Sequence, residues 1–131
     1  MTATAADLDT IRAVYAALGA QDVAAITALT DPDVQIYQSE ELPYGGVHHG
    51  YDGLAEFLGG VAKAIDSRLT TGDLYIAGDD IVQIGRSTGV ARSTGTPFDS
   101  PEVHIWRVRD GRITNLRSYI DTVEVTAALR G

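Results

Sequence analysis

One stretch decides the fold of this chain, the segment from Glu102 to Thr122, which reads EVHIWRVRDGRITNLRSYIDT. Apolar and polar residues alternate on both sides of a central Asp110-Gly111 pair. Asp-Gly between two alternating runs is the strongest short-range signal for a β-hairpin, because both residues tolerate the positive φ angles of a two-residue turn. The stretch therefore predicts two long antiparallel strands joined at Asp110 and Gly111.

The register of this hairpin predicts a polar face. Counting outward from a two-residue turn places His104 opposite Arg117 and Glu102 opposite Tyr119. Cross-strand partners share a face of the sheet. One face is then apolar, and the other collects six polar or aromatic side chains: Glu102, His104, Trp106, Arg117, Tyr119 and Asp121. We expect this second face to line a pocket or to meet another subunit.

Composition narrows the classes of function. The 131 residues carry 18 acidic and 10 basic side chains, a formal charge of -8, which argues against nucleic acid and anionic membranes as partners. The chain has no cysteine, so neither disulfides nor thiolate chemistry are available. No apolar run approaches ~20 residues, and the first residues lack the basic and apolar regions of a signal peptide. We expect one globular domain over residues 1–131 and a cytoplasmic location.

Hydrophobic periodicity predicts helices in the first half of the chain and strands in the second. Asp7, Asp22 and Asp52 are the expected helix N-caps, and Gly19 is an expected helix end. The expected order is helices at 7–19 and 22–29, a short strand at 34–38, a loop at 39–50, a helix at 52–65, a hairpin at 70–93, the hairpin at 102–122 and a last helical turn or two at 123–129. This order indicates an α+β fold with helices on one face of a curved antiparallel sheet.

Three segments resemble the nuclear transport factor 2-like (NTF2-like) superfamily. They are Tyr15–Asp22 (YAALGAQD), Gly50–Leu54 (GYDGL), and Asp110-Gly111-Arg112-Ile113 followed by Tyr119-Ile120-Asp121. The superfamily includes ketosteroid isomerase, limonene epoxide hydrolase and the SnoaL-like polyketide cyclases. The resemblance implies a cone-shaped sheet of four long strands and one short strand, with three helices packed on its concave face. It leaves the reaction open.

Comparison with ketosteroid isomerases argues against steroid isomerisation. The resemblance puts their tyrosine, their carboxylate base and their protonated acid at Val14, Gln38 and Val103, where all three functions are lost. We do not expect the neighbouring Tyr15 and Glu102 to replace them, because a shift of one residue along a strand reverses the face.

Two other members match better. The tyrosine, asparagine and aspartate that hold water in limonene epoxide hydrolase correspond to Tyr37, Ser39 and Asp121, and its epoxide-activating arginine corresponds to Arg86. The acidic residue that accompanies this arginine in limonene epoxide hydrolase is, however, missing from the sequence after Arg86. In SnoaL-like cyclases a last-strand aspartate assisted by a histidine moves protons, a pattern that Asp121 and His104 fit.

The resemblance implies Asp121, His104 and Tyr37 as catalytic residues. The expected substrate-binding residues are Gln38, Ser39, Tyr44, Arg86, Trp106, Arg117 and Tyr119. Each has a structural alternative: Asp121 could cap a last helix, and His104 could face a subunit interface. The adjacent His48 and His49 point in different directions and lack an acidic residue at metal-ligand spacing, so we expect no metal site.

The expected function is proton transfer in an apolar pocket by a cofactor-independent cyclase, isomerase or lyase of SnoaL type, acting on a polyketide-like or other apolar carbonyl compound. The alternatives are a limonene-type epoxide hydrolase and a non-catalytic module for ligand binding or dimerisation. The expected partners are a small apolar molecule and a second copy of the chain. We also expect the polar, glycine-containing loop at 39–50 to border the mouth of the pocket.

Overall fold

The computed structural model describes residues 2–131 of the chain. Over that range it contains four helices, α1 (Ala5–Gly19), α2 (Val23–Ala28), α3 (Gly50–Ala64) and α4 (Thr122–Arg130). It also contains seven strands, β1 (Thr30–Gln38), β2 (Gly46–His49), β3 (Ile65–Thr70), β4 (Leu74–Ala77), β5 (Asp80–Ala91), β6 (Pro97–Arg109) and β7 (Arg112–Ile120). The expected α+β class is confirmed, with two more strands than expected, and the last helical turn or two expected at 123–129 is the helix α4.

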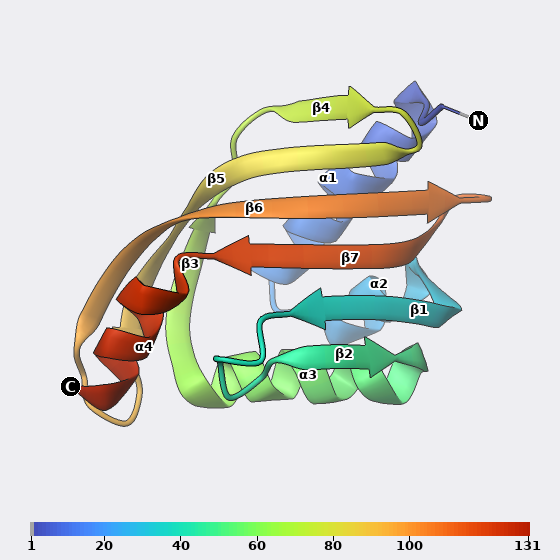
Figure 1. Ribbon diagram of the computed structural model, residues 1–131. Coiled ribbons are helices and arrows are strands. Elements are labelled where there is room, and N and C mark those ends of the chain that lie inside the picture. The colour runs from blue at the N-terminus through green and yellow to red at the C-terminus, as the bar shows by residue number, and fades with distance from the viewer. Residues whose placement is uncertain (1) are drawn as a thin grey trace.

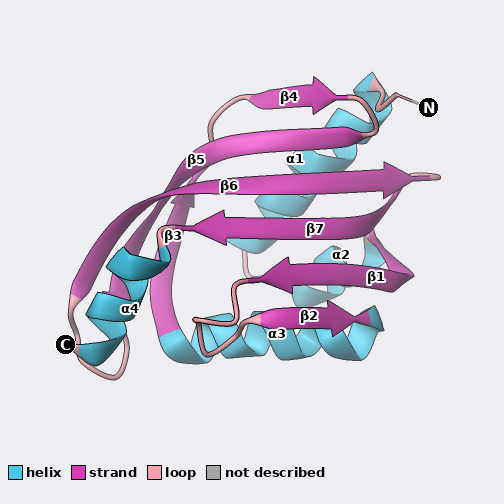
Figure 2. Ribbon diagram, in the orientation of Figure 1, coloured by secondary structure: helices cyan, strands magenta, loops and turns pink. Residues whose placement is uncertain are grey.

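A single curved sheet forms the body of the molecule, in the order β2-β1-β7-β6-β5-β3, with β4 paired to the other end of β5. The sheet is mixed rather than antiparallel, because β1 runs parallel to β7. Helices α1, α2 and α3 lie behind the sheet in the view of Figure 1, on its concave side, and α4 packs across the bent ends of β5 and β6. Figure 2 shows the same arrangement with helices and strands distinguished by colour. The hollow between sheet and helices contains a cavity.

The hairpin of β6 and β7 has the expected turn but not the expected register. Asp110 and Gly111 both have positive φ angles, 52° and 76°, as a two-residue turn of this kind requires. A β-bulge between Arg107 and Val108 then shifts the pairing by one residue, so that His104 pairs with Ser118. The predicted pairing of His104 with Arg117 is therefore wrong, because the bulge adds one unpaired residue to β7.

This bulge changes which residues share a face. Glu102, His104 and Trp106 lie on the concave face together with Leu116, Ser118 and Ile120 of β7. Arg117 and Tyr119 lie on the outer face with Val103 and Ile105. The predicted polar face is thus divided between the two sides of the sheet.

Helix ends follow local hydrogen-bond chemistry. Thr4 caps α1, with Asp7 completing a capping box, so Asp7 is the third helical residue rather than the expected cap. Asp22 caps α2 as expected. Helix α3 begins two residues before the expected cap Asp52, directly after β2, which occupies part of the predicted loop. The remaining loop is not wholly exposed, since Leu42 and Tyr44 are buried.

The hydrophobic core fills the space between the helices and the concave face. Ile11 and Val14 of α1, Phe57 of α3, and Ile81 and Trp106 of the sheet are all buried in it. Burying such side chains stabilises the fold by roughly 1.5–3 kcal/mol each. The core is interrupted at one end by buried polar residues.

Candidate active site

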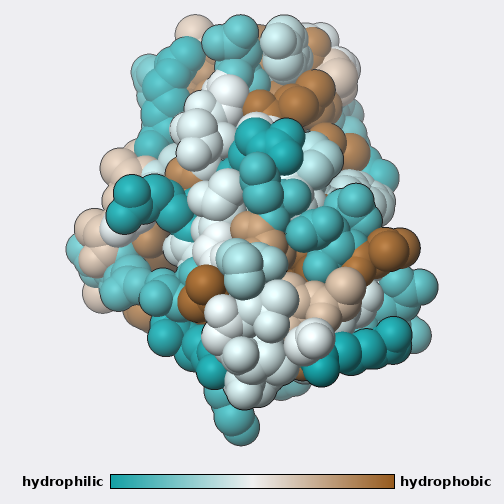
Figure 3. All heavy atoms as spheres, turned by 90° about the vertical axis from the view of Figure 1, so that its left-hand side faces the viewer, coloured by the Kyte–Doolittle hydropathy of each residue, from teal (hydrophilic) through white to brown (hydrophobic). Residues whose placement is uncertain are grey.

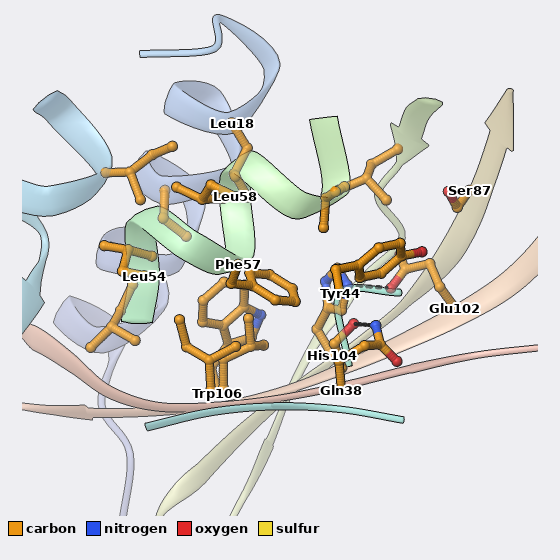
Figure 4. Close-up of a pocket in the computed structure, with 18 of the residues that line it drawn as sticks. Leu18, Gln38, Tyr44, Leu54, Phe57, Leu58, Ser87, Glu102, His104 and Trp106 are labelled. Carbon is orange, nitrogen blue, oxygen red and sulfur yellow. Dashed lines mark hydrogen bonds and ion pairs between the residues drawn. The ribbon is translucent and has the colours of Figure 1, made fainter. Parts of the chain in front are cut away.

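A cavity of about 150 Å³ lies between the concave face and the helices. Most of its wall is apolar and comes from α1, α3 and the sheet, including Leu54, Phe57 and Trp106. Polar side chains gather in one region of the wall, which contains Gln38, Tyr44, Ser87, Glu102, His104 and Ser118. In the close-up, Glu102 and Ser87 lie at one end and Leu54 at the other (Figure 4). The cavity is therefore amphipathic and suits a small molecule with one polar end.

Gln83 organises the polar end from behind. It is fully buried on β5 and lies opposite His104 in the ladder with β6. Its Oε1 accepts a hydrogen bond from the backbone N–H of Gly72 at 3.0 Å, which fixes the orientation of the amide. Its Nε2 therefore faces the site and donates to Oε1 of Glu102 at 2.7 Å and to the hydroxyl of Tyr15 at 3.0 Å.

The hydrogen bonds around Tyr15 determine the tautomer of His104. The Tyr15 hydroxyl accepts from Gln83 and from Nε1–H of Trp106, at 2.9 Å, so both of these groups are donors to the same oxygen. Its own proton must then go to Nδ1 of His104, 2.6 Å away. We infer that neutral His104 carries its proton on Nε2, the ring nitrogen nearer to Glu102.

Glu102 lines the cavity and has one buried carboxylate oxygen without a hydrogen bond from any described residue. Its side chain is 2% exposed, and its Oε2 lies 3.1 Å from Nε2 of His104 but without hydrogen-bond alignment. This Oε2 has no hydrogen-bond partner among residues 2–131. A buried carboxylate oxygen without a partner is costly, so it marks a place where a bound molecule can supply the missing contact.

Burial shifts the protonation of the three central groups. It raises the pKa of Glu102 to about 7, against a smaller lowering by the hydrogen bond from Gln83. It lowers the pKa of His104 to about 4, so the imidazole is neutral at neutral pH. It raises the pKa of Tyr15 well above its usual value, so the phenol stays protonated. The site thus holds one carboxyl near its midpoint of titration beside two neutral groups.

Two other polar groups can contact a bound molecule. Tyr44 is buried at the cavity wall, where burial raises its pKa to about 12, and its ring packs edge-on against Phe57. Its hydroxyl makes no hydrogen bond to any residue in the described range, which leaves it free to donate. Ser118 accepts a hydrogen bond from Nε2 of Gln38 at 3.1 Å, and its own proton remains available.

Comparison with known proteins assigns this architecture to a family. A family profile described as the SnoaL-like domain matches residues 11–116. The chain belongs to the SnoaL-like domain family. An uncharacterized protein of Mycobacterium tuberculosis is 31% identical over 115 residues, which cover 87% of this chain and 88% of that protein. The predicted NTF2-like, SnoaL-like identity is confirmed.

Two solved structures extend the likeness to nearly the whole chain. An NTF2-like protein of unknown function from Burkholderia pseudomallei is 27% identical, with a TM-score of 0.89 and coverage of 98% of this chain and 100% of that one. TerC, co-crystallized with polyporic acid, is also 27% identical, with a TM-score of 0.88 and coverage of 97% and 100%.

Among residues 2–131, no helix has the length and apolar character that crossing a membrane requires.

Four of the predicted site residues line the cavity of this SnoaL-like domain. They are His104, Gln38, Tyr44 and Trp106. His104 and Trp106 alternate with outward-facing residues along β6, which is why they share a face with Glu102. Gln38 and Tyr44 enter the wall from the end of β1 and from the following loop.

The other predicted residues lie elsewhere, outside the cavity wall. Asp121 caps α4 and accepts hydrogen bonds from the backbone N–H groups of Val123 and Glu124, at 3.1 and 3.2 Å. Ser39 is in the loop after β1, where its hydroxyl oxygen accepts a hydrogen bond from the N–H of Glu41. The remaining four, Tyr37, Arg86, Arg117 and Tyr119, project from the outer face of the sheet.

Three residues of the hydrogen-bonded network are absent from the predicted set: Tyr15, Gln83 and Glu102. Tyr15 and Glu102 had been set aside because each lies one residue from a position that is functional in ketosteroid isomerase. The structure places Glu102 in the cavity wall, so the argument from strand faces was wrong for Glu102, and it places the hydroxyl of Tyr15 2.6 Å from Nδ1 of His104. Gln83 gave one weak signal, an amide among the apolar residues Ile81, Val82 and Ile84.

Proposed function

We propose that this SnoaL-like domain is a cofactor-independent enzyme that uses Glu102 as general base on a small, largely apolar carbonyl compound. The observation that carries the proposal is Oε2 of Glu102, a buried oxygen without a hydrogen-bond partner among residues 2–131, in the wall of an apolar cavity. A carboxyl with a pKa of about 7 is well matched to proton abstraction at neutral pH.

The proposed chemistry begins with removal of a proton from the carbon beside the carbonyl. Oε2 of Glu102 takes the proton, and the electron pair of the C–H bond forms an enolate. The enolate oxygen accepts a hydrogen bond from the hydroxyl of Tyr44. Protonated Glu102 then returns the proton to another carbon in an isomerisation. In a ring closure the enolate carbon instead attacks a second carbonyl of the same molecule, and protonated Glu102 gives its proton to the alkoxide that forms.

The network behind Glu102 supports this role by keeping the base in place. Gln83 holds Oε1, so that Oε2 is the oxygen left for the substrate. Neutral His104 adds no positive charge that would lower the pKa of the carboxyl. Membership of the SnoaL-like family and the co-crystallization of TerC with polyporic acid also support small-molecule binding here.

An epoxide hydrolase of limonene type has less support. That function would need an acid beside Arg86 that faces the cavity. Arg86 does have an acid within reach, because its Nη2 lies 2.8 Å from Oδ1 of Asp99. Both side chains are more than half exposed, however, and neither lines the cavity, so this ion pair belongs to the outer face.

The test is hydrogen–deuterium exchange beside the carbonyl, followed by NMR in heavy water for a panel of small cyclic and aryl ketones. Wild-type protein should accelerate the exchange for at least one ketone, and Glu102→Gln should lose on the order of 10²–10⁴ of that rate. Asp121→Asn is the matched control and should stay near the wild-type rate. No acceleration by the wild type would favour the non-catalytic binding module, and a large loss in Asp121→Asn alone would return the base to Asp121.

A further inference from the structure

A second, larger hollow adjoins the cavity. This outer cleft, of about 800 Å³, lies between α1, the end of α3, β3 and the segment 71–73. It shares six lining residues with the inner cavity: Leu18, Leu58, Val61, Ile65, Ser67 and Leu69. Two of them, Leu18 and Leu58, lie at one edge of the inner cavity in the close-up (Figure 4). A molecule held in the inner cavity can therefore extend past these residues into the outer cleft.

The size of the inner cavity makes such an extension necessary for most ligands. A cavity of about 150 Å³ accommodates roughly one six-membered ring. The reacting end of a larger molecule would fill it, and the rest of that molecule would lie in the outer cleft.

The outer cleft differs from the inner cavity in charge. Arg12 of α1, Arg68 of β3 and Arg92 after β5 line it, together with two carboxylates, Asp66 and Asp73. Because Arg12 is paired with Asp9, two arginines unpaired among residues 2–131 and two carboxylates remain in this wall, in a chain where acidic residues outnumber basic ones by 18 to 10. The wall is therefore less acidic than the chain as a whole, whose formal charge is -8.

Two of these arginines are available to a ligand. Neither Arg68 nor Arg92 forms an ion pair with a carboxylate among residues 2–131. Nε of Arg92 donates to the carbonyl oxygen of Ala62 at 2.6 Å, which fixes the guanidinium plane and leaves its terminal nitrogens free. A fixed guanidinium binds a carboxylate well, because its planar N–H groups match the two oxygens. Arg12 is already paired with Asp9 at 2.9 Å.

We propose that the outer cleft is a second subsite that binds the carboxylate of the substrate through Arg68 and Arg92. The substrate class is then an apolar ring or acyl group joined by a short chain to a carboxylate. This proposal rests on the proposed function in one respect, that the inner cavity holds the reacting end of the same molecule.

The test uses three phenylalkanoates, phenylacetate, 3-phenylpropionate and 4-phenylbutyrate, each paired with its neutral amide. Titration calorimetry should find at least one carboxylate bound roughly threefold to tenfold more tightly than its amide by the wild type. The double variant Arg68→Gln/Arg92→Gln should lose this preference. Arg86→Gln, which removes an ion-paired arginine from the outer face, is the control and should keep it.

Raising the salt concentration should weaken the binding of the carboxylates and leave the binding of the amides unchanged, because salt screens the interaction between exposed charges. Equal binding of each pair by the wild type, or a preference that survives in the double variant, would overturn the subsite. Glu102→Gln separates the two proposals, since it should abolish proton exchange while keeping the carboxylate preference. If the wild type prefers carboxylates to amides but does not accelerate proton exchange, the carboxylate subsite is supported and the proposed enzymatic function is contradicted.

Discussion

Glu102 and His104 face the same cavity from alternate positions of β6, and burial acts on them in opposite directions. Burial disfavours charge, so it raises the pKa of the carboxyl to about 7 and lowers that of the imidazole to about 4. Folded Glu102 holds its proton more tightly than unfolded Glu102, so its contribution to stability is full below pH 4.5 and is lost as the pH rises through 7. The contribution of His104 is full above pH 6.5 and is lost as the pH falls through 4.

These opposed contributions predict a pH dependence that single variants reveal. Between pH 5 and 6.5 the two slopes largely cancel in the wild type. Glu102→Gln should leave the His104 slope, so that stability rises with pH by up to ~3 kcal/mol over the full range of that titration. His104→Gln should leave the Glu102 slope, so that stability falls as the pH rises. Urea unfolding measured at several pH values checks both expectations. If the free energy of unfolding of either variant depends on pH as that of the wild type does, the residue replaced in that variant has an ordinary pKa in the folded protein.

The β6–β7 hairpin illustrates how far sequence reasoning reaches at the level of an element. The alternation of residues and the Asp110-Gly111 turn predicted both strands and the turn correctly. The bulge after the turn could not be predicted, because it depends on packing and not on a local residue signal. Because of this one unpaired residue, Leu116, Ser118 and Ile120 lie on the same face of the sheet as His104, in place of the residues that were expected there. The residues predicted on β7 therefore lie outside the cavity wall, whereas His104 and Trp106 of β6 line it and Glu102 of β6 was not among the predicted site residues.

Strand β5 also positions the site through a glycine. Gly85 lies opposite Glu102, and a Cβ added to it would lie 2.8 Å from Oε1 of Glu102, 2.4 Å from Oε1 of Gln83 and 2.3 Å from the carbonyl oxygen of Thr70. All three distances are too short, and the last involves backbone. Glycine at this position therefore lets Gln83 and Glu102 meet beside the edge strand.

We predict that Gly85→Ala disrupts both the site and the sheet edge. The variant should be destabilised by roughly 1–3 kcal/mol, as expected for an overpacked interior. The matched control is Gly59→Ala in α3, where an added Cβ has open space and alanine favours the helix, so stability should hold or rise by up to ~1 kcal/mol. Thermal unfolding compares the two, and a Gly85→Ala protein as stable as wild type would show that β3 moves away freely.

At the scale of the molecule, the helices cover one face of the sheet and leave the outer face without a layer. A row of apolar and aromatic side chains crosses three paired strands on that face: Ile84 of β5, Val103 of β6 and Tyr119 of β7. Ile84 is 53% exposed and Tyr119 42% exposed, and the Tyr119 ring contacts Tyr37 of β1. The end of the molecule that carries α4 is different, because its hydrophobic residues are scattered among hydrophilic ones (Figure 3).

This uncovered row predicts the assembly. Exposed apolar patches of this kind mark contact sites, and two-fold pairing is the commonest way to cover them, since one patch then serves both copies. We predict a homodimer in which the outer faces of β5, β6 and β7 pack together. Light scattering at micromolar protein should give the mass of two chains. Ile84→Arg places a charge in the middle of the row and should shift the protein toward monomer, whereas Val123→Arg, at an exposed position on α4, should leave the dimer intact. A wild-type protein with the mass of one chain would contradict the prediction, and a dimer that survives Ile84→Arg would place the contact on another face.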